Sequence, residues 1–274
     1  MAARDPHELG PDDLVLSHFS LRHAGIEERI EAAAAGGFAG IGLYTQSYEE
    51  LRRDGWADAD LRALCAANGV CIAEIEAIRP WAARALADTT ATAFAMADAF
   101  GCRYLQCIGS HHATIEDAAH RFAELCDAGA LHGLAIGIEF LPFTDIRTAA
   151  DAHAIVERTD RSNAGVCVDA WHVHRGGREG LDRIPGEQIL AIQMNDGPII
   201  PEDDDYYSDC LTNRRLLGDG EFDLSGLIAQ LRAAGATAPW AVEVISTSLQ
   251  QLPANDAARQ MGDSMLSALV RQAD

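Results

Sequence analysis

Residues 135–170 read AIGIEFLPFTDIRTAADAHAIVERTDRSNAGVCVDA, and this stretch decides the fold class of the chain. It opens with a β-type apolar run at 135–141, continues with a helical pattern at 147–159, and returns to a β-type run at 165–170. A helix between two strands brings the chain back to the edge where the first strand began, so the two strands pair in parallel. The stretch therefore predicts one strand–helix–strand unit of a parallel sheet.

The same alternation extends in both directions until it covers the chain. Further β-type runs are predicted at 14–19, 39–44, 70–75, 104–108, 189–194 and 240–245. Helical patterns are predicted at 26–35, 48–68 with Ser47 as N-cap, 81–100, 115–131, 224–233 and 256–270. A Gly- and Arg-rich stretch with a weak helical signal follows the sixth strand. Eight strand–helix pairs with nothing left over favour a single (β/α)₈ TIM barrel as one domain over residues 1–274.

An open, doubly wound sheet is the alternative arrangement of alternating strands and helices. Such a sheet would need a phosphate-binding glycine turn, G-x-G-x-x-G, directly after a strand. The chain has no such motif, and Gly218-Asp219-Gly220 follows an irregular insertion rather than a strand. The closed barrel is therefore the better interpretation.

Four consecutive predicted strands carry a polar residue near their C-terminal ends, although a strand buried on both faces should be apolar. These residues are Glu139, Asp169, Gln193 and Glu243. In a closed barrel the four strands are neighbours, so we expect the side chains to converge at the C-terminal face, where barrel enzymes carry out their chemistry. Three carboxylates at short range need compensation, which a divalent cation supplies. The oxygen donors suit Mg²⁺ or Mn²⁺, with Co²⁺ as a third candidate. The alternative is that each residue forms a separate ion pair or lies at the rim of the barrel.

Other polar residues follow the same strands on the C-terminal side. His172 lies three residues after Asp169, and we expect it to handle protons beside the metal. We expect His111 and Trp171 to contact substrate, the alternatives being a solvated loop and a core position. Glu74 and Glu76 point to the same side of their strand by alternation. We expect Glu76 to line the pocket and Glu74 to form a structural ion pair.

These residues resemble the xylose-isomerase-like barrel superfamily of sugar phosphate isomerases and epimerases, also described as the AP endonuclease 2-type family. The resemblance covers nearly the whole chain and is most specific at VDAWH (168–172), QMND (193–196), VEV (242–244) and RLLGDG (215–220). It implies that Arg215 contacts substrate. Ketose 3-epimerases and inosose dehydratases carry a metal-binding His where this chain has Gln193. A Gln there is similar to some 3-dehydroshikimate dehydratases, which weakens the case for a ketose epimerase.

The predicted function is removal of a proton next to the carbonyl of a sugar-like or cyclic hydroxy-ketone, giving an enediolate. Glu139 and Glu243 flank the metal and are the expected base and acid. Reprotonation would make the enzyme an isomerase or epimerase. Loss of a β-leaving group would make it a lyase, such as a dehydratase of the 3-dehydroshikimate or inosose type. A non-catalytic metal-binding barrel subunit of a complex is the second alternative.

A long insertion at 197–220 follows the seventh strand and contains four acids before two tyrosines, at 202–207. A loop of this length inside a compact domain is typically a lid or binding loop. We expect a lid that closes over the metal pocket, with Arg214 and Arg215 at its end. The alternative is a solvated acidic loop.

The composition excludes some partners. The chain has 42 acidic and 21 basic residues, a formal net charge of −21, which opposes binding to nucleic acid and to anionic membranes. Seven cysteines without a Cys-x-x-Cys pair are typical of buried, reduced thiols and favour a cytoplasmic location. We expect no secretory signal and no membrane-spanning stretch. The expected partner is a small polyhydroxy or hydroxy-ketone substrate, and self-association into a homo-oligomer is left open.

Overall fold

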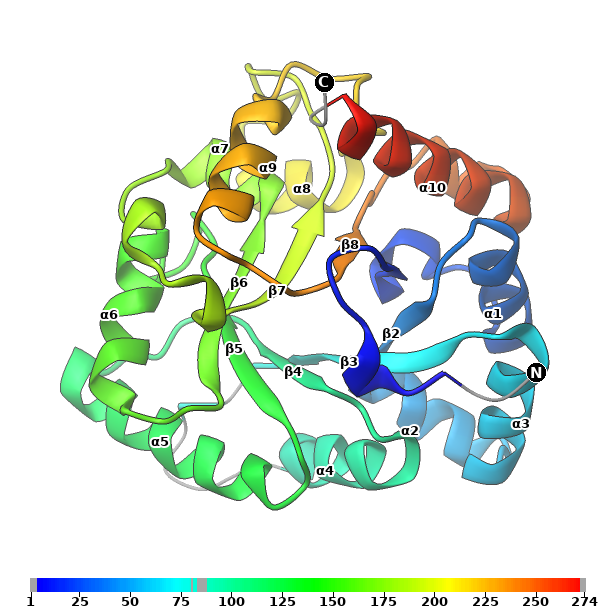
Figure 1. Ribbon diagram of the computed structural model, residues 1–274, viewed down its shortest axis with the longest axis horizontal. Coiled ribbons are helices and arrows are strands. Elements are labelled where there is room, and N and C mark those ends of the chain that lie inside the picture. Colours follow the sequence, from blue (N-terminus) through cyan, green and yellow to red (C-terminus); the bar gives the residue numbers. More distant parts are fainter. Residues whose placement is uncertain (1–3, 80, 83–87, 272–274) are drawn as a thin grey trace.

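The computed structural model describes residues 4–79, 81–82 and 88–271. Within them, eight parallel strands close into one barrel in chain order, with the eighth strand paired to the first. Helices surround the strands on the outside (Figure 1). The structure confirms the predicted (β/α)₈ TIM barrel.

The strands are β1 Leu14–Leu16, β2 Gly40–Tyr44, β3 Cys71–Ile78, β4 Tyr104–Cys107, β5 Ala135–Glu139, β6 Ala164–Asp169, β7 Ile189–Met194 and β8 Trp240–Val242. The α-helices are α1 Ile26–Ala35, α2 Thr45–Arg53, α3 Asp58–Asn68, α4 Asp88–Phe100, α5 Ile115–Ala130, α6 Ala149–Thr159, α7 Ala170–Gly176, α8 Tyr206–Thr212, α9 Leu224–Ala233 and α10 Ala254–Val270. Short 3₁₀ helices are η1 Pro6–Glu8, η2 His18–Leu21, η3 Leu181–Arg183, η4 Gly186–Gln188 and η5 Leu249–Gln251.

Three predicted elements differ from the structure. The helix predicted at 48–68 is two helices, because the carboxylate of Asp60 accepts a hydrogen bond from the Ala57 N–H at 3.2 Å and starts α3 afresh. Ser47 is not an N-cap, since α2 already begins at Thr45. The insertion at 197–220 is partly ordered as α8. The helix predicted at 81–100 begins at Asp88 among the described residues, and residues 83–87 lie outside them.

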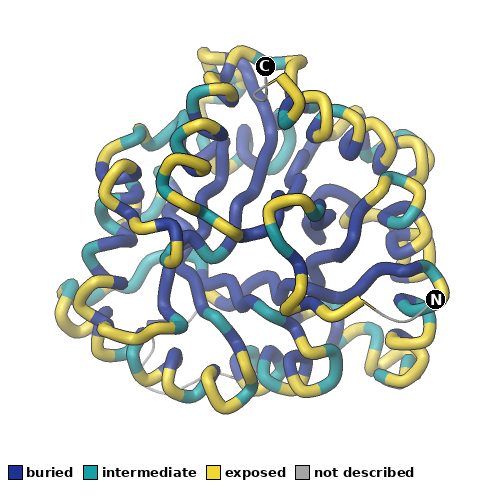
Figure 2. Tube along the Cα trace, viewed as in Figure 1, coloured by how far each residue is buried: buried dark blue, intermediate teal, exposed yellow. Residues whose placement is uncertain are grey.

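Burial follows the alternation of each strand. Val166 and Val168 of β6 belong to the main core, whose other members include the inner faces of the surrounding helices. Cys167, between them, packs instead with Tyr104 of β4 and Ala191 of β7 inside the barrel. The strands are buried along their length, while exposed residues gather on the outer helices (Figure 2). None of the described helices is long and apolar enough to cross a membrane.

This alternation places a polar layer above the apolar one. Two residues after Tyr104, Cys167 and Ala191, the chain has Gln106, Asp169 and Gln193. The register of neighbouring strands aligns them, with Asp169 directly opposite Gln193. Polar side chains therefore meet inside the barrel at the C-terminal ends of the strands.

Candidate active site

The four residues predicted as metal ligands lie in one buried network. Glu139, Asp169, Gln193 and Glu243 come from or directly follow β5, β6, β7 and β8, and each is at most 5% exposed. Ion pairs and hydrogen bonds join them through Gln106, which the strand pattern did not reveal, and through Arg214, which was expected at the end of the lid. The structure thus brings together the side chains whose convergence was expected.

Asp169 anchors one side of the network. Its Oδ1 atom accepts hydrogen bonds from the backbone N–H groups of Trp171 at 2.7 Å and His172 at 3.1 Å, so it also caps α7. Its Oδ2 atom accepts from Asn195 at 3.1 Å and from Arg214 at 2.8 Å. Burial alone would raise the pKa of Asp169, but Arg214 and these donors outweigh it and lower the pKa. The carboxylate is therefore held in its ionised form.

Arg214 is the cation at the centre of the network. Its Nη1 atom lies 2.8 Å from Oδ2 of Asp169 and 2.8 Å from Oε2 of Glu243, and Nε donates to the Cys210 carbonyl at 3.0 Å. The Arg214 side chain is 1% exposed. Hydrogen bonds between a buried guanidinium and two carboxylates are charge-assisted, so they fix the orientation of all three side chains.

Arg215, the arginine predicted to contact substrate, points elsewhere. Its side chain is 38% exposed and forms an ion pair with Glu202. Its backbone pairs with Asp196, the N–H donating at 2.8 Å and the carbonyl accepting at 3.0 Å. Consecutive residues of an extended segment point to opposite sides. Hence the guanidinium that reaches the cavity is that of Arg214.

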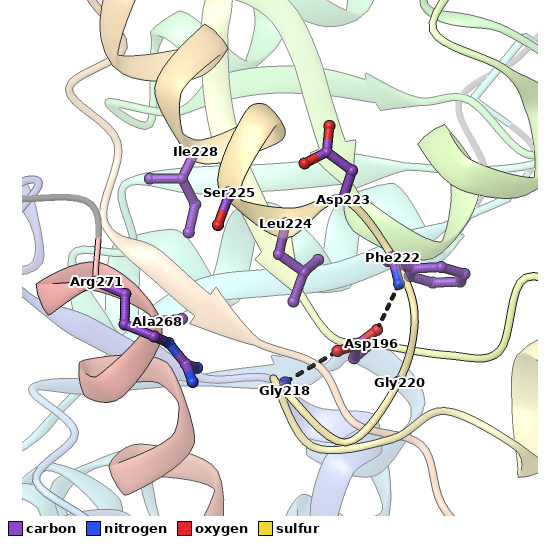
Figure 3. Close-up of a pocket in the computed structure, with 10 residues that line it drawn as sticks. All are labelled: Asp196, Gly218, Gly220, Phe222, Asp223, Leu224, Ser225, Ile228, Ala268 and Arg271. Carbon is purple, nitrogen blue, oxygen red and sulfur yellow. Dashed lines mark hydrogen bonds between the residues drawn. The ribbon is translucent and has the colours of Figure 1, made fainter.

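Asp196 fastens this segment to the barrel, as Figure 3 shows. Its Oδ2 atom accepts the N–H of Gly218 at 2.9 Å, and Oδ1 accepts the N–H of Phe222 at 3.0 Å. A Cβ atom at Gly220 would lie 2.2 Å from Oδ1, so only glycine fits there. Asp196 and the Gly218-Asp219-Gly220 turn therefore hold in place the chain segment that carries Arg214.

Glu139 and His172 form the opposite side of the network. His172 Nε2 lies 3.3 Å from Oε1 of Glu139, and Gln106 donates to Oε2 at 2.7 Å. One potential ligand atom each from Glu139, Asp169 and His172 lies within 4.8 Å of the others, the spacing of a possible metal-binding triad. The Nδ1 atom of His172 is buried and has no hydrogen-bond partner among the described residues.

Glu243 follows β8 and completes the network. Its Oε1 atom accepts hydrogen bonds from Ser17 Oγ at 2.7 Å and from Gln193 Nε2 at 3.3 Å. Burial raises the pKa of Glu243 to about 7, although Arg214 opposes the shift. With all three carboxylates ionised, Arg214 balances one of three negative charges. The two that remain match the charge of one divalent cation.

A cavity of about 220 Å³ opens above this network. Its floor includes Gln106, Glu139, His172, Arg214 and Glu243. Its walls are otherwise largely apolar, and Phe19, Phe143 and Tyr207 supply aromatic rings. Arg22 and Arg79 also line the cavity, and both are exposed to solvent.

The other predicted substrate-contacting residues lie outside the lining of this cavity. Trp171 is 1% exposed, and its ring packs against Tyr206. His111 lies in the loop after β4, and its Nδ1 atom accepts the N–H of Ala113 at 3.1 Å. Glu76 is buried inside the barrel beside Ser17.

Glu74 forms the predicted structural ion pair. The Nη1 atom of Arg103 lies 2.8 Å from Oε1 of Glu74, and Glu74 is buried. The same guanidinium also donates to the carbonyl of Leu190 at 2.7 Å. This pair is separate from the network around Arg214.

Comparison with known proteins identifies the family of this barrel. The family described as the xylose isomerase-like TIM barrel matches residues 30–267. A 3-dehydroshikimate dehydratase of Pseudomonas aeruginosa is 30% identical over 241 residues, which are 83% of this chain and 37% of that protein. The chain thus spans little more than a third of that relative's length. An inosose isomerase of Bacillus subtilis is 27% identical over 140 residues, 49% of this chain and 48% of that protein.

A solved structure supports the fold. The crystal structure of the IOLI protein with a binding zinc atom superposes with a TM-score of 0.83 at 18% sequence identity. The match covers 95% of this chain and 99% of that chain. At this identity the likeness bears on the fold of the barrel.

Proposed function

Because this chain belongs to the xylose isomerase-like TIM-barrel family, we propose that it is a divalent-metal-dependent enzyme that removes a proton next to the carbonyl group of a small hydroxy-ketone. The observation that carries the proposal is the group of buried carboxylates, Glu139, Asp169 and Glu243, at and beneath the floor of a small cavity. Isomerisation of a hydroxy-ketone and elimination of water from one both begin with loss of that proton. The relatives named above as an isomerase and a dehydratase are consistent with this shared step.

The donor set fits a divalent ion. Glu139, Asp169, Gln193 and Glu243 offer oxygen atoms, and His172 adds a ring nitrogen within reach of two of them. The proposed ions are Mn²⁺, Mg²⁺ and Co²⁺, because carboxylate and amide oxygens suit such cations. When bound, the ion would act as a Lewis acid that polarises the carbonyl group of the substrate.

Glu139 and Glu243 are the proposed proton-transferring groups. Glu139 is the last residue of β5 and Glu243 follows β8, and two strands separate β5 from β8, so the two carboxyl groups approach the cavity floor from different sides. Two carboxyl groups placed in this way can serve opposite faces of a planar enolate. His172, beside Glu139, is placed to pass a proton between that carboxyl group and the cavity.

The mouth of the cavity favours a substrate with a carboxylate. Arg22 and Arg79 both line it, and the contacts of Arg22 with Gln250 and Leu211 are long, at 3.4 and 3.5 Å. Guanidinium groups bind carboxylates through paired hydrogen bonds. A neutral ketose or inosose has no negative charge for these guanidinium groups to pair with. We therefore favour dehydration of a carboxylated cyclic hydroxy-ketone, as in a 3-dehydroshikimate dehydratase.

The insertion at 197–220 is the proposed lid, although its parts differ. Tyr207 of α8 lines the cavity, and its ring packs edge-on against Phe143 at 5.6 Å between centroids. The buried ion pair between Asp209 and Arg175 fastens α8 to α7. Residues 199–205 are more exposed, so we expect this part of the insertion to move.

The experiment is a comparison of two substrates. Purified protein with Mg²⁺, Mn²⁺ or Co²⁺ is incubated with 3-dehydroshikimate and, separately, with an inosose. We expect loss of water from the first, abolished by a chelator and slowed roughly 10²-fold or more by Glu139→Gln. Turnover of the inosose alone would keep the metal-dependent proton transfer and overturn the dehydratase assignment. Turnover of neither substrate with any of the three ions would leave the proposed function unsupported and favour a non-catalytic metal-binding subunit.

A further inference from the structure

Glu76 of β3 is a buried carboxyl group that the proposed reaction does not use. It is 1% exposed and lies inside the barrel. The neighbouring strand makes room for it, because a Cβ atom at Gly42 of β2 would lie 1.8 Å from the Glu76 Oε1 atom. The sequence therefore contains a glycine where this carboxyl group needs space.

The contacts of Glu76 impose a constraint on protons. Its Oε1 atom accepts the N–H of His18 at 3.1 Å, and its Oε2 atom lies 3.0 Å from Ser17 Oγ. The same hydroxyl oxygen lies 2.7 Å from Oε1 of Glu243. A serine hydroxyl has one hydrogen and cannot donate to two carboxylates at once. Both contacts are hydrogen bonds only if one of the two carboxyl groups carries a proton and donates it to Ser17.

We propose that Glu76 is that protonated group: a neutral carboxylic acid that donates to Ser17, whose hydroxyl in turn donates to Glu243. Glu76 is then a positioning residue, since it fixes the direction of the Ser17 hydroxyl and thereby one oxygen atom of Glu243. The arrangement of hydrogen bonds stands on the geometry alone, and only the catalytic importance of Glu243 rests on the proposed function.

The ionisable groups around Glu76 assign the proton to it. Glu243 has Arg214 at 2.8 Å as its counterion, whereas Glu76 has no cation within 4.0 Å among the described residues. Glu74, on the same strand, is paired with Arg103. Burial, and next the charge of Glu243, raise the pKa of Glu76 well above its ordinary value.

Among the described residues no cation lies within 4.0 Å of Glu76, and the charge of Arg29 acts on it from behind the His18 ring. Burial lowers the pKa of His18 of η2 to about 2, with Arg29 adding to the shift, so this ring is neutral. Arg29 of α1 is the cation behind it, and it is occupied by His18 Nδ1 at 2.7 Å and by the Ala24 carbonyl at 3.0 Å. Tyr44 of β2 contributes no cation, and its ring packs against the ring of His18 at 5.8 Å between centroids.

Infrared difference spectroscopy of purified, metal-loaded wild-type protein against Glu76→Gln tests the proposal directly. The wild type at neutral pH should show the carbonyl band of a protonated carboxyl group, and the variant should lack it. Glu74→Gln is the matched control on the same strand and should leave the band of Glu76 in place, because the carboxyl group of Glu74 is paired with Arg103 rather than with Ser17. Absence of the band from the wild type would overturn the proposal, whatever the turnover of the enzyme.

A second arm uses the pH dependence of stability. A carboxyl group that keeps its proton in the folded protein but loses it in the unfolded chain above its ordinary pKa of 4.5 makes stability fall as pH rises. Glu76→Gln removes this loss, so its stability relative to wild type should increase with pH above that value. A constant difference would contradict a protonated Glu76.

Activity separates positioning from simple structure. The amide that Glu76→Gln introduces can donate to Ser17 as the acid does, so kcat should fall less in this conservative variant than in Ser17→Ala. Ser17→Ala breaks the chain to Glu243 and should lower kcat by about tenfold, the scale of one lost hydrogen bond to a charged group, and should shift the pH profile. A large loss of kcat in Glu76→Gln with a normal Ser17→Ala would mean that Glu76 works as a charged carboxylate.

Discussion

The Nη1 atom of Arg214 lies 2.8 Å from the Oδ2 atom of Asp169, and both side chains are almost completely buried. The same nitrogen reaches Glu243 at 2.8 Å, so one guanidinium partly neutralises two of the three carboxylates in the network. A divalent cation would neutralise the negative charge that remains. Arg214 and the proposed metal ion would therefore neutralise the three carboxylates together.

Replacing Arg214 by Met should expose this balance. Removal of one partner from a buried ion pair typically costs about 3–5 kcal/mol, because the other charge is left uncompensated. Thermal unfolding should therefore show a large loss of stability in the metal-free variant. Added Mn²⁺ or Mg²⁺ should restore more stability to Arg214→Met than it adds to the wild type.

Arg215→Met is the matched control, since the two arginines are neighbours and only Arg215 is half-exposed. An exposed ion pair contributes only about 0–1 kcal/mol, so this variant should unfold close to the wild type. If Arg215→Met instead raises KM while Arg214→Met does not, the substrate-contacting arginine is the one predicted from the family resemblance.

Asp196→Ala should loosen the segment that carries Arg214. Three backbone N–H groups, of Gly197, Gly218 and Phe222, lose their shared acceptor. We expect kcat/KM to fall by about tenfold or more, because misplacement of a charged group near the reacting atoms is costly. Asp219→Ala, an exposed acid in the same loop, should have little effect. An equal fall of kcat/KM in the two variants would contradict a specific positioning role for Asp196, because it would show that removing any acidic side chain from the loop has the same effect.

Arg22→Met and Arg79→Met should act on substrate binding. If these residues bind a carboxylate, each variant should raise KM for 3-dehydroshikimate by about tenfold, the scale of one charge-assisted hydrogen bond. A neutral cyclic hydroxy-ketone, tested as a poor substrate or competitive inhibitor, should bind both variants as it binds the wild type. Equal weakening for the acid and the neutral compound would point to a loss of cavity shape rather than of charge recognition.

Glu139→Gln should keep the shape of the side chain and remove its ability to take a proton. Loss of general acid–base catalysis should lower kcat by roughly 10²-fold or more. Circular dichroism should show an intact barrel, because Gln106 and His172 retain a polar partner of the same size. A variant that folds and keeps near-normal kcat would remove Glu139 from the acid–base pair.

The fold could be predicted because local patterns and topology agree. The run from Ala135 to Asp169 already contains a complete strand–helix–strand unit, and repetition of that unit leads to a closed barrel. The four polar residues near the ends of β5 to β8 were recognisable because a charged or amide group interrupts an otherwise apolar strand. Their convergence follows from strand order alone.

The rest of the site depends on details that strand patterns do not contain. Gln106 interrupts β4 in the same way, but a single amide in a short strand gives a weaker signal than a carboxylate. Ser17 contributes only a small hydroxyl group just after β1. The choice between Arg214 and Arg215 is set by the backbone pairing of Arg215 with Asp196, a contact across 19 residues of sequence that periodicity does not reveal.

Mass spectrometry of 3-dehydroshikimate and its product after reaction in D₂O is the decisive test of metal-dependent proton removal and dehydration. The measurement follows exchange of the hydrogen next to the carbonyl group together with loss of water, in metal-loaded and chelator-treated protein. Both events should occur in the metal-loaded wild type, neither should occur in the chelated protein, and both should be roughly 10²-fold slower or more in Glu139→Gln. Full turnover by metal-free protein, or product formed by Glu139→Gln at the wild-type rate, would contradict this mechanism.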